Sequence, residues 1–473
     1  MRVQIAEHTT PFTIDGKTRF SCGESSLDAE TATVSVAGYR PPVMRYRVAV
    51  EELSGKTLLG YKDRLAKTAT EMETSLEIFS TGGIFSLGER RIDNREYFIV
   101  LSETFEDKTA AEARQERLRN EYPGRQILVI PVFIRPAEAT LTVTAHHRTL
   151  LCKDFVSLSV TVTAQAPHMA LVAGRPLFLY ATSEESVGIV IEEDVEQLLY
   201  RILPGEMFVS APIETLKAQA VAARTDIFMQ LGKRHIGDPF HICSEIHCQK
   251  LDWREKETAP KFKQAVDTTR GEILLYKDIY VVRAPYSSSC GGHTEAIENV
   301  WFSSPREYLR GVWDMPNPPR LDLTRAMDVR KFLEETEGEC DIPLNKKFRW
   351  KKEIPEKNLD ELVAALGVGH VTELRPVNRG VSGRIWKLLV IGDTGEKAVW
   401  GELIIRRLLD DMPSSLFVVD HIPEKKVWRF TGAGWGHGVG MCQMGAISLG
   451  KRGKKYREIL DHYYPGTMVS KIY

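Results

Sequence analysis

Two acidic side chains near the middle of the chain lie where proton transfer could be arranged. Glu206 lies in the segment LPGEMF, and Glu214 follows eight residues later. We expect Glu214 in the first turn of a helix. There the helix dipole stabilises the ionised carboxylate, which makes Glu214 a poor proton donor. We expect Glu206 in a loop, where shielding by Met207 and Phe208 would favour the protonated form that a general acid needs. An ordinary surface glutamate is the alternative.

Thiol and imidazole groups with ligand-like spacing occur in FHICSEIHCQ, residues 240–249. Three residues separate Cys243 from His247, and Cys248 follows directly. This donor set favours zinc, although a structural zinc site normally has four protein ligands and this segment offers two or three. A disulfide between Cys243 and Cys248 is the alternative if the protein is exported. We therefore predict zinc, in a structural or supporting role, on Cys243 and His247.

A polar turn with two glycines lies in PYSSSCGGHTE, residues 285–295. Cys290 and His293 are three residues apart in one loop, whereas catalytic Cys–His pairs usually come from distant segments. A substrate-binding or metal-supporting loop is therefore favoured over a thiol nucleophile. The residues we expect to contact substrate are Ser289, Gly291, Gly292 and His293.

The segment GAGWGHGVGMCQMGA, residues 432–446, contains six glycines. Glycine loses the most conformational entropy on ordering, so such a run indicates that something approaches the backbone closely. A flexible linker would not carry Trp435, His437 and Gln443. We expect these three residues in a binding site.

Composition limits the classes of protein to consider. The chain has 473 residues, enough for two or three domains, with 43% hydrophobic and 27% charged residues. A net charge of −1 without a basic block argues against nucleic acid as the main partner. No apolar run is long enough to span a membrane, and the first twenty residues lack a signal-peptide core. Seven scattered cysteines do not form a disulfide framework.

The elements that must position these groups differ between the two parts of the chain. Residues 1–165 form a β-rich region, with strands expected in TATVSVAG, MRYRVAVEEL and ATLTVTAHH. Within it, residues 95–105, 108–122 and 125–134 indicate strand, helix and strand, with the helix stopping at Pro123-Gly124. This order resembles the SPOR modules that bind bare glycan strands, and an unrelated packing domain is the alternative.

The remainder, residues 168–473, indicates a mixed domain around one long helix. That helix begins at Ser210 or Pro212, ends at Gly232 and carries one apolar stripe. A mixed α/β subdomain at about 318–425 contains the helix LDELVAALG and the strands RIWKLLVIGD and KAVWGELIIRR. The predicted fold class is α+β, with β-rich subdomains and a β-rich N-terminal region before the catalytic domain.

Four motifs, in this order, resemble those of the sporulation stage II protein D (SpoIID) family, which includes the amidase-enhancer LytB proteins. They are LPGEM…APIETLKAQAVAARTDIF, CSEIHCQ, YSSSCGGHTE and GWGHGVGMCQMGA, and the similarity covers about 168–473. The resemblance implies a peptidoglycan lytic transglycosylase with Glu206 as its acid. It also implies a zinc site at Cys243 and His247. The spacing between these two residues is one residue shorter here than in the family. Other departures are Phe208, Asp226 and Met444.

One acid suffices for the implied reaction. It protonates the glycosidic oxygen between N-acetylmuramic acid (MurNAc) and N-acetylglucosamine (GlcNAc), and the carboxylate then takes the proton of the muramyl 6-hydroxyl as it attacks the anomeric carbon, leaving a 1,6-anhydro-MurNAc end. Ordinary glycosidases need a pair of carboxylates instead. We expect Lys217, Gln219 and Arg224 to bind sugar groups, Trp435 to stack on a sugar and His437 to make a polar contact.

Alternatives remain open at this point. The same fold could serve a non-catalytic, glycan-binding enhancer of a separate wall amidase. A zinc amidase or peptidase would need an open three-ligand site, and the sequence has no HExxH motif. Because peptidoglycan lies outside the cytoplasmic membrane, we expect the protein in the periplasm or cell wall. Its sequence would then begin downstream of the true start, or export would use an unrecognised route, with residues 1–165 holding the catalytic domain on the wall.

Overall fold

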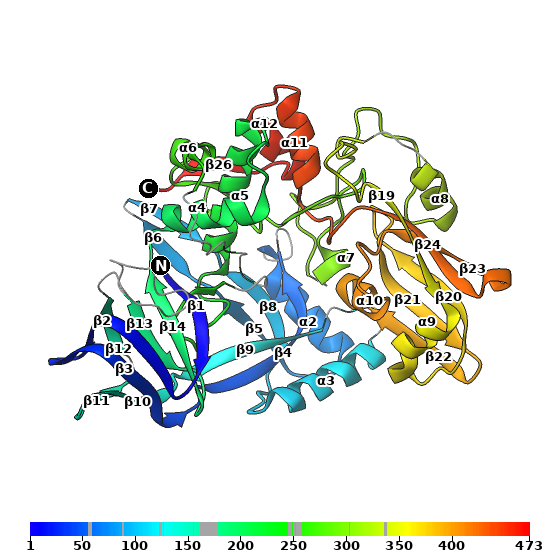
Figure 1. The fold of residues 1–473 in the computed structure, drawn as a ribbon. Coiled ribbons are helices and arrows are strands. Elements are labelled where there is room, and N and C mark those ends of the chain that lie inside the picture. The colour runs from blue at the N-terminus through cyan, green and yellow to red at the C-terminus, as the bar shows by residue number, and fades with distance from the viewer. Residues whose placement is uncertain are drawn as a thin grey trace. The chain divides into compact units, whose positions relative to one another are not determined.

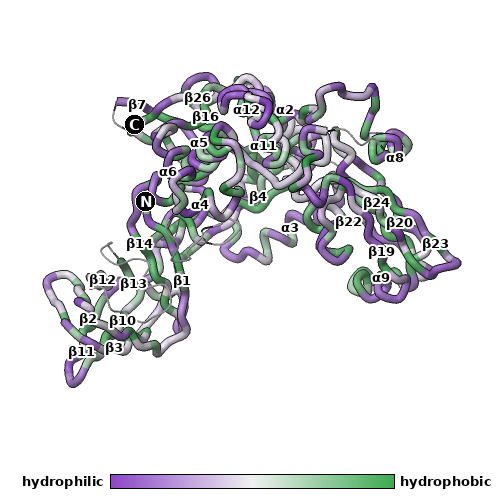
Figure 2. Tube along the Cα trace, turned by 45° about the horizontal axis from the view of Figure 1, so that its top comes forward, coloured by the Kyte–Doolittle hydropathy of each residue, from purple (hydrophilic) through white to green (hydrophobic). Residues whose placement is uncertain are grey.

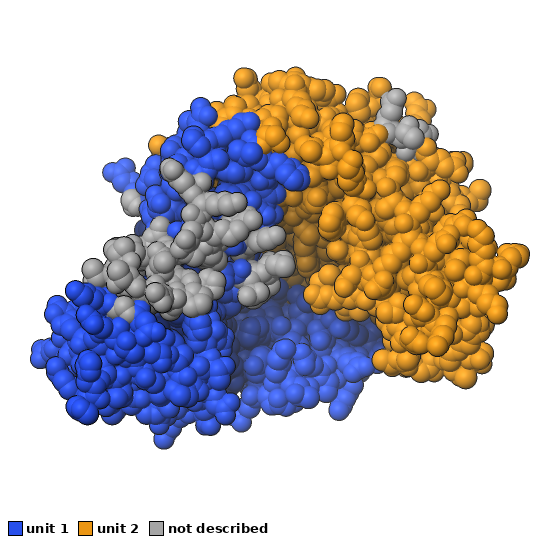
Figure 3. Space-filling model, in the orientation of Figure 1, with its two compact units in different colours: residues 1–50, 65–209, 227–270 blue, residues 51–64, 210–226, 271–473 orange. Residues whose placement is uncertain are grey.

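A computed structural model gives the arrangement of the chain (Figure 1). It describes residues 1–473 except 55–58, 88, 123–124, 126, 155, 161–176, 245–247, 249–250, 252–257, 302 and 335–337. The described residues form two compact units, shown in different colours in Figure 3. Unit 1 comprises residues 1–50, 65–209 and 227–270, and unit 2 comprises residues 51–64, 210–226 and 271–473. The predicted boundary near residues 165–168 lies outside the described residues.

The larger sheet of unit 1 consists mainly of antiparallel strands with alternating burial. In β10, Leu141 and Val143 are fully buried while Thr142 between them is partly exposed, because successive side chains of a strand point to opposite faces. The strands predicted in TATVSVAG and ATLTVTAHH are confirmed. The sheet order is β11 (Arg148–Lys153), β10 (Glu138–Ala145), β3 (Ser25–Arg40), β2 (Phe12–Cys22), β12 (Val156–Val160), β13 (Leu177–Ala181), β14 (Ser186–Glu192), β1 (Arg2–Thr9) and β15 (Ile242–Cys243).

A second sheet of unit 1 has the β-α-β-β-α-β order of ferredoxin-like modules. Its spatial order is β5 (Leu76–Thr81), β8 (Glu96–Leu101), β4 (Val43–Leu53) and β9 (Leu128–Arg135). Helices α2 (Tyr61–Glu71) and α3 (Lys108–Glu121) lie in the two connections, with the hairpin β6 (Ile84–Leu87) and β7 (Arg90–Asp93) inserted before β8. The predicted strand–helix–strand is confirmed, while the predicted stop at Pro123-Gly124 lies outside the described residues. Helix α2 was not predicted.

Two helices carry the proposed acid and its neighbours along the sequence. Helix α4 (Val195–Glu206) begins at Asp194, whose carboxylate accepts from the backbone of Glu196, and α6 (Pro260–Thr268) packs against α4. Helix α5 spans Ile213–Gln230, close to the predicted bounds. Nearly every residue of α5 is buried, polar ones included, so it does not show the single apolar stripe that the spacing predicts.

Unit 2 contains short strands and helices, and two of the sequence motifs, residues 285–295 and 432–446, lie side by side on them. Strand β18 (Tyr286–Ser287) runs parallel to β25 (Met441–Cys442), so the segment of residues 285–295 pairs with the glycine-rich segment. Helices α11 (Gln443–Lys451) and α12 (Tyr456–Tyr463) follow. The other elements of this part are β16 (Glu272–Tyr276), β17 (Tyr280–Val281), β26 (Met468–Lys471) and α7 (Glu298–Trp301).

The predicted mixed subdomain consists of two three-stranded sheets around a shared apolar core that includes Trp350, Leu388 and Phe430. The predicted strand KAVWGELIIRR is wrong in its second half: β22 ends at Trp400 and α10 begins at Glu402, because Gly401 at φ 96° breaks the strand. The turn between strands β23 (Phe417–Ile422) and β24 (Val427–Ala433) is hydrophilic in Figure 2. The elements are α8 (Ala326–Glu334), β19 (Arg349–Pro355), α9 (Glu356–Val363), η2 (Ala364–Leu366), β20 (Val371–Arg379), β21 (Ile385–Gly392), β22 (Gly395–Trp400), α10 (Glu402–Leu408), β23 (Phe417–Ile422), η3 (Pro423–Lys425) and β24 (Val427–Ala433).

The mixed α+β class is therefore as predicted. Among the helices that the structure describes, none has both the length and the apolar character needed to cross a bilayer.

Candidate active site

Glu206 is the last residue of helix α4 rather than a loop residue, which corrects the prediction. The helix continues through Pro204, which cannot donate to the carbonyl of Tyr200; the Thr258 hydroxyl donates to that carbonyl instead, at 3.2 Å. Glu206 is half-buried. Of its expected shields, Met207 is buried but Phe208 is 50% exposed. A carboxylate at the negative end of a helix dipole is disfavoured, which suits an acid that must hold a proton.

Three side chains of unit 1 that offer atoms able to ligate a metal lie together. His235, Cys243 and Cys248 each offer one ligand atom, and these atoms lie within 4.8 Å of one another. Nε2 of His235 is 3.3 Å from Sγ of Cys248, and its Nδ1 is 2.8 Å from the carboxylate of Asp238. A carboxylate on the far ring nitrogen orients a metal-ligating histidine. The predicted ligand His247 lies outside the described residues.

His235 was missed from the sequence because it lies outside the motif that carries Cys243. Its position eight residues before that cysteine was the available signal. Both cysteines are free thiols in the structure, and burial raises the pKa of Cys248 to about 12 in the metal-free protein. Binding of a metal would have to displace that proton.

Glu214 and Lys217 occupy the first turn of α5. The Glu214 carboxylate accepts from Nζ of Lys217 at 2.9 Å and from the backbone N–H of Tyr456 at 3.0 Å. Burial acts to raise the pKa of Glu214, but these two donors outweigh it and the pKa is lowered. Glu214 is thus a poor proton donor that ties α5 to α12. Lys217 also lies over the Tyr456 ring, at 5.7 Å.

The two predicted sugar-binding residues deeper in α5 are buried. The Gln219 side chain accepts from Nε2 of Gln443 at 3.4 Å, and its own Nε2 has no hydrogen-bond partner among the described residues. Arg224 is fully buried and donates to the carbonyl of Glu272 at 2.9 Å. A guanidinium held this way offers a glycan no surface, so we leave Arg224 out of the proposed site.

Ser289 and Trp435 face each other across the two paired segments. Each backbone N–H donates to the other's carbonyl, at 3.1 and 2.8 Å. Ser289 is buried, whereas the indole of Trp435 is 51% exposed, with Nζ of Lys347 5.7 Å from its ring centroid. The structure thus joins two motifs that the sequence separates and leaves one aromatic side chain open to a ligand.

The glycine-rich segment has an internal reason for its composition. Gly438 has φ 76°, and a Cβ there would overlap the buried guanidinium of Arg384. That guanidinium donates to the carbonyl of Cys290 at 3.1 Å and to the hydroxyl of Ser382 at 3.0 Å. The close approach that the glycines permit therefore includes the chain's own side chains, which the sequence interpretation did not foresee. Gly291 and Gly292 are likewise buried.

Glu295 joins the same segments and was also missed. Its fully buried carboxylate accepts from the backbone of Ala296, Val381 and Ser382, and from the side chains of Asn299 and Ser382, at 2.6–3.1 Å. Its own N–H donates to the carbonyl of Gly438 at 2.8 Å. This single side chain satisfies five donors from two segments, residues 296–299 and 381–382.

The two histidines of the motifs are neutral for the same physical reason. Burial lowers the pKa of His293 to about 4, and its Nδ1–H donates to the carbonyl of Thr294 at 2.6 Å. His437 is half-buried; desolvation and then the charge of Arg384 lower its pKa. Nδ1 of His437 accepts from the N–H of Val439 at 3.0 Å, so the proton of its neutral ring is on Nε2.

We expect the stability of unit 2 to fall as the pH drops from about 6.5 to about 4. In that window the unfolded chain binds a proton at His293 that the folded chain, with its pKa lowered to about 4, does not bind. The resulting loss in the free energy of unfolding reaches about 3 kcal/mol once His293 is protonated in both the unfolded and the folded chain. Arg384 and Asp314 are the charged groups that act on this ring, in opposite directions. Denaturant midpoints measured across the window check the expectation.

His293→Asn is the matched variant for this pH dependence, because an amide can still donate to the carbonyl of Thr294. It should lower stability at every pH by removing the ring from its edge-on contact with Trp313, at 4.4 Å. It should also reduce the slope between pH 6.5 and 4, leaving the part that the lowered pKa of His437 contributes. A slope equal to that of the wild type would show that another group is responsible.

A buried group of four donors lies beside these motifs in unit 2. Cys290, Asp314, Cys340 and Cys442 are fully buried, and their ligand atoms lie within 4.8 Å of one another. Such a set could hold a metal ion. The sequence interpretation did not connect these residues, because they lie far apart along the chain.

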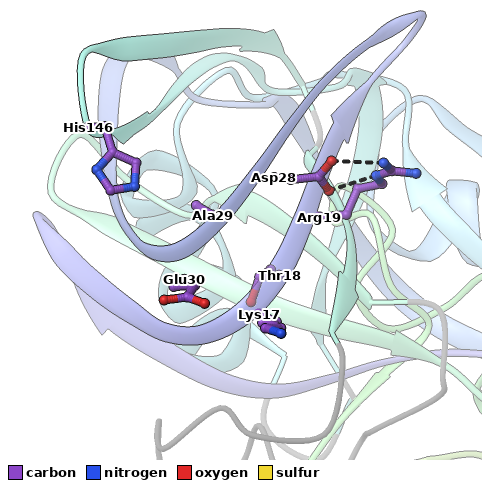
Figure 4. Close-up of a pocket in the computed structure, with 7 residues that line it drawn as sticks. All are labelled: Lys17, Thr18, Arg19, Asp28, Ala29, Glu30 and His146. Atoms are coloured by element: carbon purple, nitrogen blue, oxygen red, sulfur yellow. Dashed lines mark hydrogen bonds and ion pairs between the residues drawn. The ribbon is translucent and has the colours of Figure 1, made fainter.

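A pocket of about 550 Å³ lies on unit 1, away from any predicted site residue of that unit (Figure 4). The ion pair of Arg19 and Asp28, at 2.8 Å, lies on its wall, and both side chains are more than half exposed. Lys17, Glu30 and His146 are also exposed. Thr18 is the buried polar residue of its lining, while the charged side chains on its wall are exposed, so we assign it no ligand.

Comparison with known proteins gives two family matches. The model described as Stage II sporulation protein, SpoIID, matches residues 183–276. A domain of unknown function (DUF8618) matches residues 295–440. An uncharacterized protein of Brachyspira hyodysenteriae is 30% identical over 290 residues, which cover 61% of this chain and 70% of that protein. The chain belongs to the SpoIID/LytB family.

Two further SpoIID/LytB relatives have functional names. An amidase enhancer of Bacillus subtilis is 28% identical over 295 residues, 57% of this chain and 40% of that protein. A stage II sporulation protein D of Bacillus amyloliquefaciens is 27% identical over 316 residues, 62% of this chain and 78% of that protein. The SpoIID match contains Glu206, Cys243 and Lys217. The DUF8618 match begins at Glu295, the last residue of one motif, and extends into the glycine-rich motif of residues 432–446, where it includes Trp435 and His437.

Proposed function

We propose that the protein is a lytic transglycosylase that cleaves the MurNAc–GlcNAc bond of peptidoglycan. The observation that carries the proposal is the position of Glu206. It is half-buried at the C-terminal end of α4, within the matched SpoIID segment, where the helix dipole favours the protonated acid. One such group can act first as the acid and then as the base.

The second part of the proposal is that unit 2 has a glycan-binding surface of its own. Trp435 offers an exposed indole, and the half-buried, neutral ring of His437 lies two residues along the same segment. Gln219 is fully buried, as Arg224 is, so we leave it out of this surface as well. Lys217, Ser289, His293 and Gln443 line or support the same segments.

Mass spectrometry of digested peptidoglycan tests the reaction. Incubation of purified glycan strands with the full chain should release fragments that end in 1,6-anhydro-MurNAc. Reducing ends formed with addition of water would instead identify a hydrolase. No new ends of either kind would leave only a binding role and would contradict the proposed activity.

We expect Trp435→Ala to weaken glycan binding about tenfold, the loss of one aromatic stacking contact. Folding should be unaffected, because the backbone bonds to Ser289 do not involve the indole. Binding of isolated glycan strands by calorimetry measures the effect. Trp400→Ala is the matched control: it removes another tryptophan with a lysine over its ring, Nζ of Lys387 at 4.2 Å, from the sheet of β20, β21 and β22. Equal affinities of the two variants would exclude Trp435 as the sugar platform.

We also propose zinc in unit 1, in a supporting role. The donors present fit zinc, since thiolate and imidazole are its preferred ligands, and His235 joins Cys243 and Cys248 in holding it. When bound, the ion would fix the segment that follows α5. Metal analysis of chelator-free protein should show about one zinc fewer per chain in Cys243→Ser than in wild type. No difference, with two fewer free thiols than the seven cysteines predict, would favour a Cys243–Cys248 disulfide.

A second candidate function rests on the amidase-enhancer relative. On this alternative the protein binds glycan and stimulates a separate wall amidase. Adding the chain to an amidase and sacculi separates the two: stimulation that persists in Glu206→Gln, without anhydro ends in the wild type, would favour the enhancer.

The substrate implies that the protein acts outside the cytoplasmic membrane, in the periplasm or cell wall. We propose that residues 1–165 hold residues 168–473, the catalytic region, on the wall; the ferredoxin-like order of the sheet β5–β8–β4–β9 supports a discrete module there. Fractionation of the native host is the test. A strictly cytosolic pool would contradict this location.

A further inference from the structure

The four donors of unit 2 come from four separate segments. Cys290 follows β18, Asp314 lies in the loop after α7, Cys340 lies between α8 and β19, and Cys442 ends β25 and caps helix α11. All four side chains are fully buried. Three cysteines and one aspartate supply a complete set of four ligands, the number that a closed structural zinc site uses.

The sulfur geometry fits a shared metal better than a bond between sulfurs. Sγ of Cys290 is 3.7 Å from Sγ of Cys340. Two thiolates on a tetrahedral zinc, at about 2.3 Å each, lie about 3.8 Å apart, whereas a disulfide would require about 2.05 Å. The Cys290 thiol is 3.0 Å from Oδ2 of Asp314. That separation would open to about 3.6 Å around the ion.

Backbone N–H groups point at two of the sulfurs. The N–H of Gly292 donates to Sγ of Cys290 at 3.3 Å. Sγ of Cys442 accepts from the N–H of Cys290 at 3.2 Å and from that of Gly445 at 3.4 Å. In a metal site, donors of this kind and the positive end of α11 would offset the negative charge of bound thiolates. Two of the three sulfurs therefore already accept the hydrogen bonds that metal-bound sulfurs need.

The aspartate is held so that one oxygen faces the sulfurs. Oδ1 of Asp314 accepts from the hydroxyl of Tyr463 at 2.8 Å, which leaves Oδ2 toward Cys290. Hydrogen bonds of this type orient a carboxylate ligand. A side chain at position 445 would overlap both Asp314 and Tyr463, so the glycine there keeps the space open.

Nearby cations reduce the electrostatic cost of such a site. Three thiolates and one carboxylate around zinc carry a net negative charge, which burial makes costly. The guanidinium of Arg384 donates to the carbonyl of Cys290 at 3.1 Å, and that of Arg349 donates to the carbonyl of Gly291 at 2.9 Å. Two positive charges thus lie beside the ligands.

We propose that Cys290, Asp314, Cys340 and Cys442 form a closed structural zinc site, separate from the donors His235, Cys243 and Cys248. Asp314 and Cys340 belong to the region matched by DUF8618, residues 295–440, whereas Cys290 and Cys442 lie just outside its two ends. The ion would fasten the two ends of that region to residues within it. Since the protein fills all four positions, none is left for a reacting water, and the role is structural. The proposal is independent of the transglycosylase activity.

Metal analysis of the full chain in the Cys243→Ser background tests the site, because that change disables the other donor group. About one zinc per chain should remain. Adding Cys442→Ser should remove it, whereas the control Cys22→Ser, at a half-buried cysteine of β2, should leave the count unchanged. Absence of zinc from the folded Cys243→Ser protein would overturn the proposal. So would a thiol count showing that Cys290 and Cys340 are joined as a disulfide.

A milder change keeps the test valid if Cys442→Ser fails to fold. Asp314→Asn preserves the shape of the side chain and an acceptor for Tyr463, but it weakens the ligand. We expect zinc to pass to a chromogenic chelator about 10 to 100 times faster than in the parent. Cobalt replacing zinc in the Cys243→Ser protein should show a thiolate-to-metal charge-transfer band. An unchanged release rate in Asp314→Asn, or no such band, would contradict the assignment.

Discussion

Glu206→Gln is expected to reduce the release of 1,6-anhydro-MurNAc ends by at least about 100-fold. The amide keeps the size of the side chain at the end of α4 but can neither give a proton to the glycosidic oxygen nor take one from the muramyl 6-hydroxyl. Stability should change by no more than about 0.5 kcal/mol, because the position is half-buried and the replacement is isosteric. Turnover of isolated glycan strands, followed by mass spectrometry, measures the loss.

Glu214→Gln is the matched control, eight residues further along the chain. It weakens the interactions with Lys217 and the N–H of Tyr456, so it should cost about 1 kcal/mol of stability while most activity remains. Cleavage by Glu206→Gln at a rate near that of the wild type would remove Glu206 from the mechanism. Binding of glycan by Glu206→Gln with unchanged affinity would show that the loss is one of chemistry and not of recognition.

Glu295→Gln is expected to be the most destabilising of these changes, lowering the free energy of unfolding of unit 2 by about 3–5 kcal/mol. Its carboxylate accepts five hydrogen bonds in a fully buried place. An amide would turn one acceptor into a donor that faces other donors, leaving buried polar groups unsatisfied. Urea denaturation followed by circular dichroism measures the shift in midpoint.

Glu396→Gln makes the same chemical change on the exposed strand β22. It should alter stability by less than about 0.5 kcal/mol. If Glu295→Gln and Glu396→Gln unfold at the same urea concentration, the carboxylate of Glu295 does not hold the segments together. In that case interactions other than the carboxylate bonds would have to keep the N–H of Glu295 next to the carbonyl of Gly438.

Local structure was largely predictable because its causes are local. The bounds of α5 follow from Pro212 at its start and Gly232 after its end. Strand β10 follows from its alternation, and the hairpin of β21 and β22 from its turn residues. Of the two wrong predictions of local structure, the strand KAVWGELIIRR ended early for a local reason, Gly401, whereas the loop predicted for Glu206 involves a tertiary contact. Helix α4 runs on to Glu206 because Thr258, 58 residues from Tyr200, satisfies the carbonyl that Pro204 leaves free.

Candidate site residues could be proposed from the sequence where a motif held them in one segment. Glu206, Cys243, His293 and Trp435 were proposed from their neighbours in the sequence, and their roles stay predictions. Partners from outside the motifs were not proposed. His235 lies before its motif, and Glu295 was visible only as the last residue of one, with no sign that Val381 and Ser382 donate to it.

The sequence by itself therefore determined the α+β class, the ends of the main helix and the order of the motifs, since each depends on residues within a few turns of one another. Only the tertiary structure decided that Gly438 lies on the guanidinium of Arg384. It likewise decided that Cys290 meets Cys442, 152 residues away. Such contacts depend on how every intervening element packs, and no local spacing encodes that packing.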